Sequence, residues 1–238
     1  MGSLSYQVLF FTVVMLMEST VYLQSLPDIN DQGFISDSVA VHNEYRSKVE
    51  PCASDMKEMS WDNDLAKTAS KWAKHCSFSH NPDLKQPGKA HPTFSTVGEN
   101  IWVGGPPHSF SVARAIKLWY DEVTYYDYTT NACTKICGHY TQVVWAKSYK
   151  VGCAVQTCPN GITGFSDTAS AIYVCDYGPA GNYKGQQPYT EGSNCFTSSA
   201  SCNSFCIAVL ITRPVSVIVI FAAAYGLQMF YPNMFIYE

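Results

Sequence analysis

The ten cysteines of this 238-residue chain constrain its fold more than any other feature. Near the N-terminus, an apolar run of ten residues from Val8 to Met17 ends before Glu18. A run of this length is typical of the core of a secretory signal peptide and is too short to span a bilayer. We therefore predict a signal peptide at residues 1–22, cleaved between Ser19 and Ser25. In that context the cysteines are expected to form disulfides.

Charge and cysteine spacing exclude two classes of function. The net charge is -4 and no run of Lys or Arg occurs, so nucleic acid is not expected as a partner. The tight cysteine clusters are Cys133 with Cys137 and Cys202 with Cys206, and neither has a His at ligand spacing. A zinc finger is therefore not expected.

Three segments in the first half of the chain have apolar residues at helical spacing. In one of them Leu65, Ala69 and Trp72 share a face, while lysines line the other faces. Another follows a capping residue at Ser109 or Ser111. We predict helices over residues 35–46, 65–76 and 112–123.

The β signal comes later in the chain. Residues 151–156 and 171–175 are short, β-branched or aromatic segments bounded by Gly, Pro and Asn. Residues 82–107 are rich in Pro, Gly and Ser and are expected to be mostly loop, interrupted by the segment from Gly98 to Trp102. Helices followed by strands in a chain of this length indicate one α+β domain.

The C-terminal part differs in composition from the rest. Residues 191–206 are predicted to be a cysteine-containing hinge, and residues 214–231 form an apolar stretch of 18 residues. As a helix this stretch would measure about 27 Å, close to the thickness of the hydrocarbon layer. We predict a single-pass transmembrane helix. A GPI-anchor signal, suggested by the small residues at 198–201, and a buried structural helix are the alternatives.

These segments together place the protein in the secretory pathway. We expect it on the extracellular face of the plasma membrane, held by a single span or a GPI anchor, with secretion as the alternative. The membrane is thus one expected partner, through the C-terminal segment.

Two longer motifs carry a family resemblance. They are Gly138–Trp145 (GHYTQVVW) and Ile172–Tyr183 (IYVCDYGPAGNY). They resemble the two signatures of the CAP superfamily, named for the cysteine-rich secretory, antigen 5 and pathogenesis-related 1 proteins, with Asp176 where Asn is commoner. The resemblance runs from about residue 26 to 206 and is greatest to the glioma pathogenesis-related proteins. It implies a disulfide-stabilised, three-layer αβα sandwich, which we place at residues 26–190.

The same resemblance implies a disulfide pattern. Cys76 would pair with Cys158, Cys153 with Cys175, and Cys133 with Cys137. Cys52 is an additional cysteine, and the hinge contains Cys195, Cys202 and Cys206. Either Cys52 pairs with the hinge or two thiols stay free, and the sequence alone does not choose between these connectivities.

Four residues fall on family positions that converge on a central cleft: His80, Glu99, Glu122 and His139. The resemblance implies that His80 and His139 hold a divalent cation, zinc or another, although the fold does not require one. Imidazole nitrogens suit Zn²⁺, and nearby carboxylates orient such rings. From the residues alone, their spacing is not a metal motif. Each His could be a surface or core residue, Glu99 a loop carboxylate, and Glu122 a solvated residue near the end of the third predicted helix.

The cleft could in principle catalyse metal-assisted hydrolysis, because imidazole titrates near neutrality and a bound metal acidifies water. However, the chain has no HExxH helix, no GxSxG elbow and no cysteine nucleophile with an assigned His. We therefore predict a non-enzymatic binding or interaction module. A protease or other hydrolase that uses the same cleft is the alternative.

An apolar ligand is the remaining candidate. CAP relatives bind sterols or fatty acids, and an aromatic region containing Tyr125, Tyr126 and Tyr128 could line such a site. The competing interpretation is ordinary packing, which we favour for the neighbouring Trp119. A lipid or a protein partner thus stays an expectation at this stage.

Overall fold

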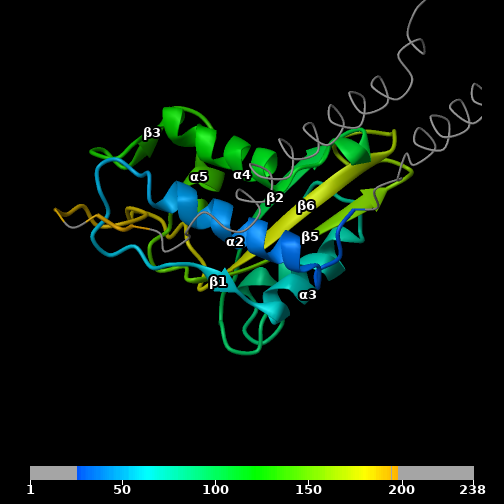
Figure 1. Ribbon diagram of the computed structural model, residues 1–238, viewed down its shortest axis with the longest axis horizontal. Coiled ribbons are helices and arrows are strands. Elements are labelled where there is room, and N and C mark those ends of the chain that lie inside the picture. Colours follow the sequence, from blue (N-terminus) through cyan, green and yellow to red (C-terminus); the bar gives the residue numbers. More distant parts are fainter. Residues whose placement is uncertain (1–25, 194, 198–238) are drawn as a thin grey trace, which may run out of the picture. The chain divides into compact units, whose positions relative to one another are not determined.

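A computed structural model of the protein describes residues 26–193 and 195–197 (Figure 1). The predicted signal peptide at 1–22, the predicted transmembrane or anchor segment at 214–231, and Cys202 and Cys206 all lie outside these residues. Within the described residues, no helix is long and apolar enough to cross a membrane.

A four-stranded sheet forms the centre of the domain, in the order β1-β5-β6-β2. The antiparallel pair β5 (Lys150–Cys158) and β6 (Ser170–Gly178) occupies the middle. The strand β2 (Gly98–Gly104) pairs antiparallel with β6 at one edge, and the short β1 (Ser60–Trp61) pairs parallel with β5 at the other. Both segments predicted to be strands are found, each extended by a few residues.

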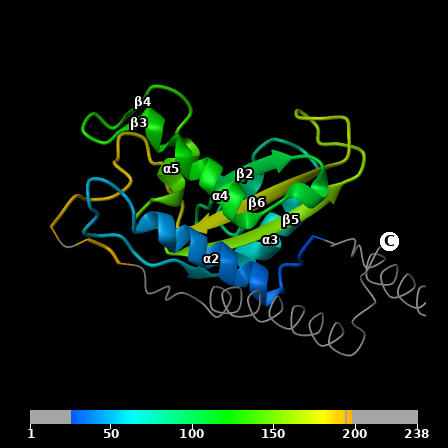
Figure 2. The same cartoon turned by 45° about the horizontal axis from the view of Figure 1, so that its top comes forward.

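Helices cover both faces of this sheet (Figures 1 and 2). On one face lie α2 (Gln32–Arg46), α4 (Val112–Tyr120) and α5 (Gly138–Val143), and on the other lies α3 (Asn63–Ala73). Odd-numbered residues of β5 and β6 pack with the first group, and even-numbered residues pack with α3. This alternation is expected of a sheet buried on both faces. The result is the three-layer αβα sandwich that the sequence predicts.

The predicted helices are all present, with two differences at their ends. The helix α3 ends at Ala73, before Cys76, whose φ of 48° does not fit a helix. The helix α4 begins after Ser111, whose Oγ accepts a hydrogen bond from the backbone N–H of Arg114, and it ends at Tyr120. The 3-10 helix η3 (Asp121–Tyr125) follows, so Glu122 lies on this tighter turn and not on the α-helix.

Short elements complete the domain around these layers. Two are 3-10 helices in the long predicted loop, and two are the strands of a small antiparallel hairpin. They are η1 (Pro82–Lys85), η2 (Pro107–Ser109), β3 (Tyr126–Asp127) and β4 (Ala132–Cys133).

Four disulfides crosslink the described residues. Cys76 is bonded to Cys158, Cys153 to Cys175, and Cys133 to Cys137. These are the pairs that the family resemblance implies. The fourth joins Cys52 to Cys195 across 143 residues, which resolves the open choice for Cys52 in favour of the hinge.

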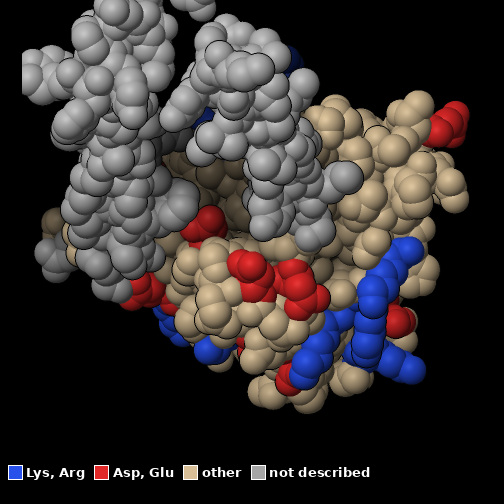
Figure 3. Space-filling model, turned by 45° about the vertical axis from the view of Figure 1, so that its right-hand side comes forward, with Lys and Arg blue, Asp and Glu red and all other residues tan. Residues whose placement is uncertain are grey.

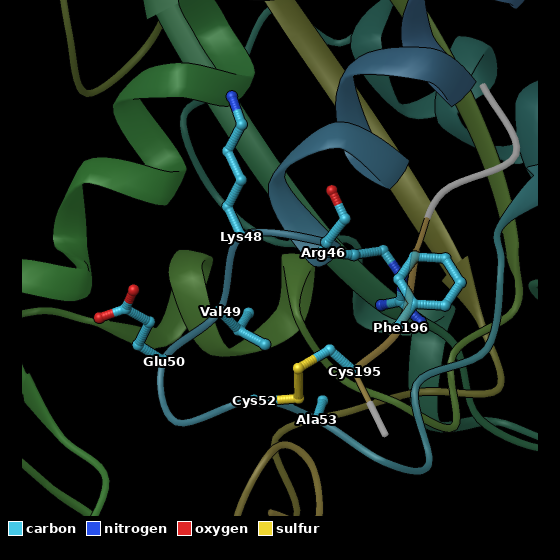
Figure 4. A pocket seen from close by; sticks show the side chains of 9 residues that line it. Arg46, Lys48, Val49, Glu50, Cys52, Ala53, Cys195 and Phe196 are labelled. Atoms are coloured by element: carbon cyan, nitrogen blue, oxygen red, sulfur yellow. A yellow bond between two sulfur atoms is a disulfide. The ribbon is translucent and has the colours of Figure 1, made fainter. Parts of the chain in front are cut away.

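The described part of the predicted hinge is packed on the domain. The backbone N–H of Gly192 donates to the carbonyl of Cys52, and that of Phe196 donates to the carbonyl of Ala53. A pocket of about 230 Å³ lies here, beside the Cys52–Cys195 disulfide (Figure 4). It is lined by Arg46, Ser47, Lys48, Val49, Glu50, Cys52, Ala53, Cys195 and Phe196.

Charged side chains gather along the lower part of the described surface that is visible in Figure 3. Basic and acidic residues alternate along its lower edge, and most of the remaining visible surface is uncharged. This fits a composition in which 14% of the residues are charged.

Candidate metal centre and cleft

His80 and Glu99 form the first of two histidine–carboxylate pairs. His80 lies in the loop before η1, and Glu99 is the second residue of the edge strand β2. The Nδ1 atom of His80 lies 2.7 Å from Oε1 of Glu99, and the same oxygen accepts the backbone N–H of Asn81 at 3.1 Å. The His80 side chain is 64% exposed, whereas the Glu99 side chain is fully buried. The hydrogen bond to Glu99 raises the pKa of His80.

His139 and Glu122 form the second pair. His139 is the second residue of α5, and its Nδ1 lies 2.7 Å from Oε1 of Glu122. The other carboxylate oxygen accepts the backbone N–H groups of His139 and Tyr140, at 3.0 and 3.3 Å. Glu122 therefore satisfies donors at the start of α5 and orients the ring of His139 at the same time. Both side chains are mostly buried.

The two pairs leave the same atom of each imidazole free. Because a carboxylate can only accept, the proton of each ring sits on Nδ1. No hydrogen bond within the described residues involves Nε2 of either His80 or His139. A neutral imidazole with Nδ1–H held by a carboxylate and Nε2 open is the usual arrangement of a metal-binding histidine.

Residues next to Glu99 connect the two pairs. The side-chain amide of Asn100 donates to the carbonyl of His139 at 3.0 Å. The ring of Trp119 stacks on that of His139, with 6.4 Å between centroids, and its Nε1–H donates to the carbonyl of Ile101. The strand β2 thus carries Glu99 of the first pair and is hydrogen-bonded to the helix α5, which carries His139 of the second. That both free nitrogens face one cation stays a prediction.

A different group has ligand atoms close enough to one another to hold a metal ion. Such a group contains at least three His, Cys, Asp or Glu side chains whose ligand atoms all lie within 4.8 Å of one another. One such group is found within the described residues, and it consists of Asp62, Asp64 and His91. Sequence reasoning did not single them out, although Asp62 directly precedes an apolar helical pattern. The four predicted residues are not such a group. This fits their pairing, in which the carboxylates lie behind the rings.

The hydrogen bonds of this second group serve the start of α3. Oδ1 of Asp62 accepts the N–H groups of Asp64 and Leu65, as a helix cap does. Nδ1 of His91 accepts two backbone N–H groups, those of Thr93 and Phe94, so its ring proton sits on Nε2 and faces Asp62 at 3.3 Å. A metal at Nε2 would have to displace that proton. The group is therefore a candidate cation site whose donors already have structural roles.

The three tyrosines predicted to line a lipid site each have a local partner. The hydroxyl of Tyr126 donates to Oδ1 of Asn131, and the hydroxyl of Tyr128 donates to the backbone carbonyl of Tyr189. The rings of Tyr128 and Tyr189 also stack on each other. The ring of Tyr125 lies 4.7 Å from Nζ of Lys135. None of the three lines the pocket of Figure 4.

Comparison with known proteins agrees with this architecture. Residues 39–177 match the family model of the cysteine-rich secretory proteins, CAP. The chain is 50% identical over 192 residues to glioma pathogenesis-related protein 1 of Mus musculus. The aligned region covers 79% of this chain and 70% of that protein. The chain belongs to the CAP family and is closely related to the glioma pathogenesis-related proteins.

Two solved structures show the same fold. The crystal structure of NaASP2 with Zn²⁺ has a TM-score of 0.54 and 27% identity, covering 76% of this chain and 98% of that one. The crystal structure of Na-ASP-1 has a TM-score of 0.55 and 27% identity, covering 75% of this chain. This chain spans about half (49%) of Na-ASP-1.

Proposed function

We propose that the protein is a non-enzymatic, extracellular binding module whose cleft holds a divalent cation, with Zn²⁺ as the best candidate. The observation that carries this proposal is the matched geometry of the two pairs. Each imidazole has Nδ1 2.7 Å from a carboxylate oxygen and leaves Nε2 without a partner among the described residues. Nε2 of His80 and Nε2 of His139 would be the ligand atoms.

The donor set fits zinc better than a harder cation. Imidazole nitrogen is a common zinc ligand, whereas Mg²⁺ and Ca²⁺ prefer oxygen. The carboxylates of Glu99 and Glu122 would offset charge through the rings without binding the metal directly. A related structure, that of NaASP2, contains Zn²⁺, which supports testing this ion first.

Two protein ligands would leave positions on the cation for a polar group of a partner. The ion would supply Lewis acidity to that group, and the exposed side chain of His80 would give access. Turnover needs a nucleophile or a positioned base in addition. All eight cysteines in the described part of the chain form disulfides, so none of them offers a thiolate nucleophile. These features favour binding over catalysis.

The proposal also places the protein in an oxidising compartment. Four disulfides in one small domain are typical of secreted or extracellular proteins. Attachment to the membrane through residues 214–231 is part of the proposal, as is a lipid or protein partner.

Titration calorimetry with ZnCl₂ on the purified full-length chain tests the cation site. We expect one site, lost in both His80→Ala and His139→Ala. His108→Ala is the matched control, because His108 is exposed on η2 and belongs to neither pair. Binding that survives both cleft variants and disappears in His91→Ala would move the site to the Asp62 group and refute the proposal.

Two further measurements separate the alternatives. Cleavage of a peptide or ester that vanishes in His80→Ala and in Glu122→Gln would establish the hydrolase instead. Mass spectrometry of the purified chain would identify any copurified sterol or fatty acid. Such a lipid, if lost in Tyr128→Ala but kept in His139→Ala, would assign it to the tyrosine region and not to the cleft.

A further inference from the structure

Glu99 has a buried acidic neighbour that neither histidine pair uses. Asp176 lies directly opposite Glu99 in the antiparallel register of β6 and β2. Cross-strand partners of this kind project from the same face of a sheet, with their Cβ atoms about 5 Å apart. Asp176 is fully buried, and neither of its carboxyl oxygens has a hydrogen-bond partner among the described residues. The second oxygen of Glu99, Oε2, is also buried and without a partner.

In the part of the chain that the structure describes, no cationic side chain lies beside Asp176. On its other side the register places Gly152 of β5, where an added Cβ would collide with the backbone of Ala66 in α3. The face of α3 toward the sheet consists of Leu65, Ala66, Ala69 and Ala73.

The charged groups of the neighbouring elements point elsewhere. Those of α3 and of Lys74, which follows it, are exposed: the helix residues are Asp64, Lys67 and Lys71. Asp62 and His91 lie near one another at the start of that helix. On the opposite face of the sheet, Arg46 donates to backbone carbonyls. Among the described residues, Glu99 is thus the charged neighbour that raises the pKa of Asp176, and it has the same sign of charge.

Two ionised carboxylates cannot satisfy each other, because both only accept hydrogen bonds. One proton between them removes the repulsion and creates a donor. Glu99 already accepts from His80 and from the N–H of Asn81, which favours its charged form. Burial and the negative charge of Glu99 both raise the pKa of Asp176 well above the ordinary aspartate value. The proton therefore belongs on Asp176.

We propose that Asp176 is a neutral carboxylic acid in the folded protein and a positioning residue for the cleft. Its proton is donated to Oε2 of Glu99 and fixes the carboxylate that orients His80. The consequence for cation binding rests on the proposed function, whereas the protonation state of Asp176 does not.

The first experiment measures protonation without a metal. The thermal midpoints of the wild type and Asp176→Asn are compared from pH 4 to pH 8. Because the folded-state pKa of Asp176 is raised, its contribution to stability is fully present below the unfolded pKa of 3.8 and is lost as the pH rises. The Asn side chain does not ionise and so does not lose stability in this way. The thermal midpoint of Asp176→Asn, relative to that of the wild type, should therefore rise steadily with pH. Asp167→Asn, in the exposed β5–β6 loop, should show no such trend. A constant or shrinking difference for Asp176→Asn would overturn the proposal.

The second experiment reads the same group directly and then its effect on the cleft. At pH 7 the side-chain ¹³C resonance of Asp176, assigned by its absence in Asp176→Asn, should lie at the protonated position. An ionised position would overturn the proposal. Asp176→Leu removes the donor and should weaken ZnCl₂ binding at least about 10-fold, while Asp176→Asn keeps a donor and most of the affinity. Equal affinities in both variants would show that Asp176 does not position Glu99.

If neither the wild type nor any of the variants binds zinc, the proposed function is wrong. The two pH-dependent measurements still decide the state of Asp176.

Discussion

The inner face of α2 and the cleft at Glu99 both bury polar groups, but they differ in how many of those groups have hydrogen-bond partners. On α2, the guanidinium of Arg46 donates to five backbone carbonyls, including those of Val143 at the end of α5 and Trp145 just after it. His42 bonds through both ring nitrogens, to the carbonyl of Ser38 and to the hydroxyl of Tyr177. At the cleft, three buried oxygens, Oε2 of Glu99 and both carboxyl oxygens of Asp176, have no hydrogen-bond partner within residues 26–193 and 195–197.

This difference separates stability from binding capacity. A buried polar group whose hydrogen bonds are all made fixes one arrangement of the chain, because any other arrangement leaves several buried groups without hydrogen bonds. A buried group with missing partners costs stability and persists where it serves a site. Substitutions should therefore act mainly on folding in the first region and mainly on ligand affinity in the second.

Arg46→Met should have the largest effect. It fills a similar volume but leaves the carbonyls of Lys57, Val143, Trp145, Ala146 and Ser148 without their donor. We expect a loss of about 3 kcal/mol or more in the free energy of unfolding, measured by urea denaturation. Lys48→Met, at an exposed position two residues later, should change it by no more than about 0.5 kcal/mol. Similar effects of the two variants would contradict the assignment of Arg46 as the anchor of this region.

His42 should make the fold sensitive to acid. Burial lowers its pKa from 6.5 to about 4, so its neutral form is stabilised in the folded state. The contribution, about 3 kcal/mol, is fully present above pH 6.5 and is lost as the pH falls toward 4. His42→Asn keeps a donor for Ser38 and should flatten the dependence of the urea midpoint on pH over this range. The exposed His108→Asn should keep the wild-type slope, and an unchanged slope in His42→Asn would assign the acid sensitivity elsewhere.

Glu99→Gln tests the other side of the comparison. The amide oxygen can still accept from His80 and Asn81, and the change removes a negative charge beside Asp176. We expect the free energy of unfolding at pH 7 to change by no more than about 1 kcal/mol, while zinc affinity falls about 10- to 100-fold. Calorimetry and urea denaturation on the same samples give both numbers. A large loss of stability with little loss of affinity would reverse the roles of the two regions.

The sequence predicted the layers of this fold better than its polar contacts. The apolar spacing of Leu65, Ala69 and Trp72 marks the buried face of α3, because that spacing is a direct consequence of helical geometry. The end of α4 at Tyr120 was not predictable in this way, since the apolar pattern continues into η3 while the hydrogen bonding changes.

Residues of the cleft were suggested by family motifs, and their pairing was not visible in the sequence. His80 and Glu99 are separated by 19 residues, and only the return of the loop to the edge of the sheet joins them. The placement of the buried Asp176 opposite Glu99 was equally hidden, because an apolar strand sequence gives no sign that a carboxyl group within it faces another one. The hinge as predicted gave no indication that Gly192 and Phe196 pair with the backbone at Cys52 and Ala53.

The Cys52–Cys195 bond has a consequence for how the protein withstands proteolysis. It closes a loop of 143 residues that contains the sheet and, of the helices in the described residues, all except α2. A single cut in any exposed loop between these two cysteines, such as the one around Gly164, leaves both pieces covalently joined. Nicked molecules would migrate as one species until a reductant is added, and no fragment carrying His80 or His139 could diffuse away.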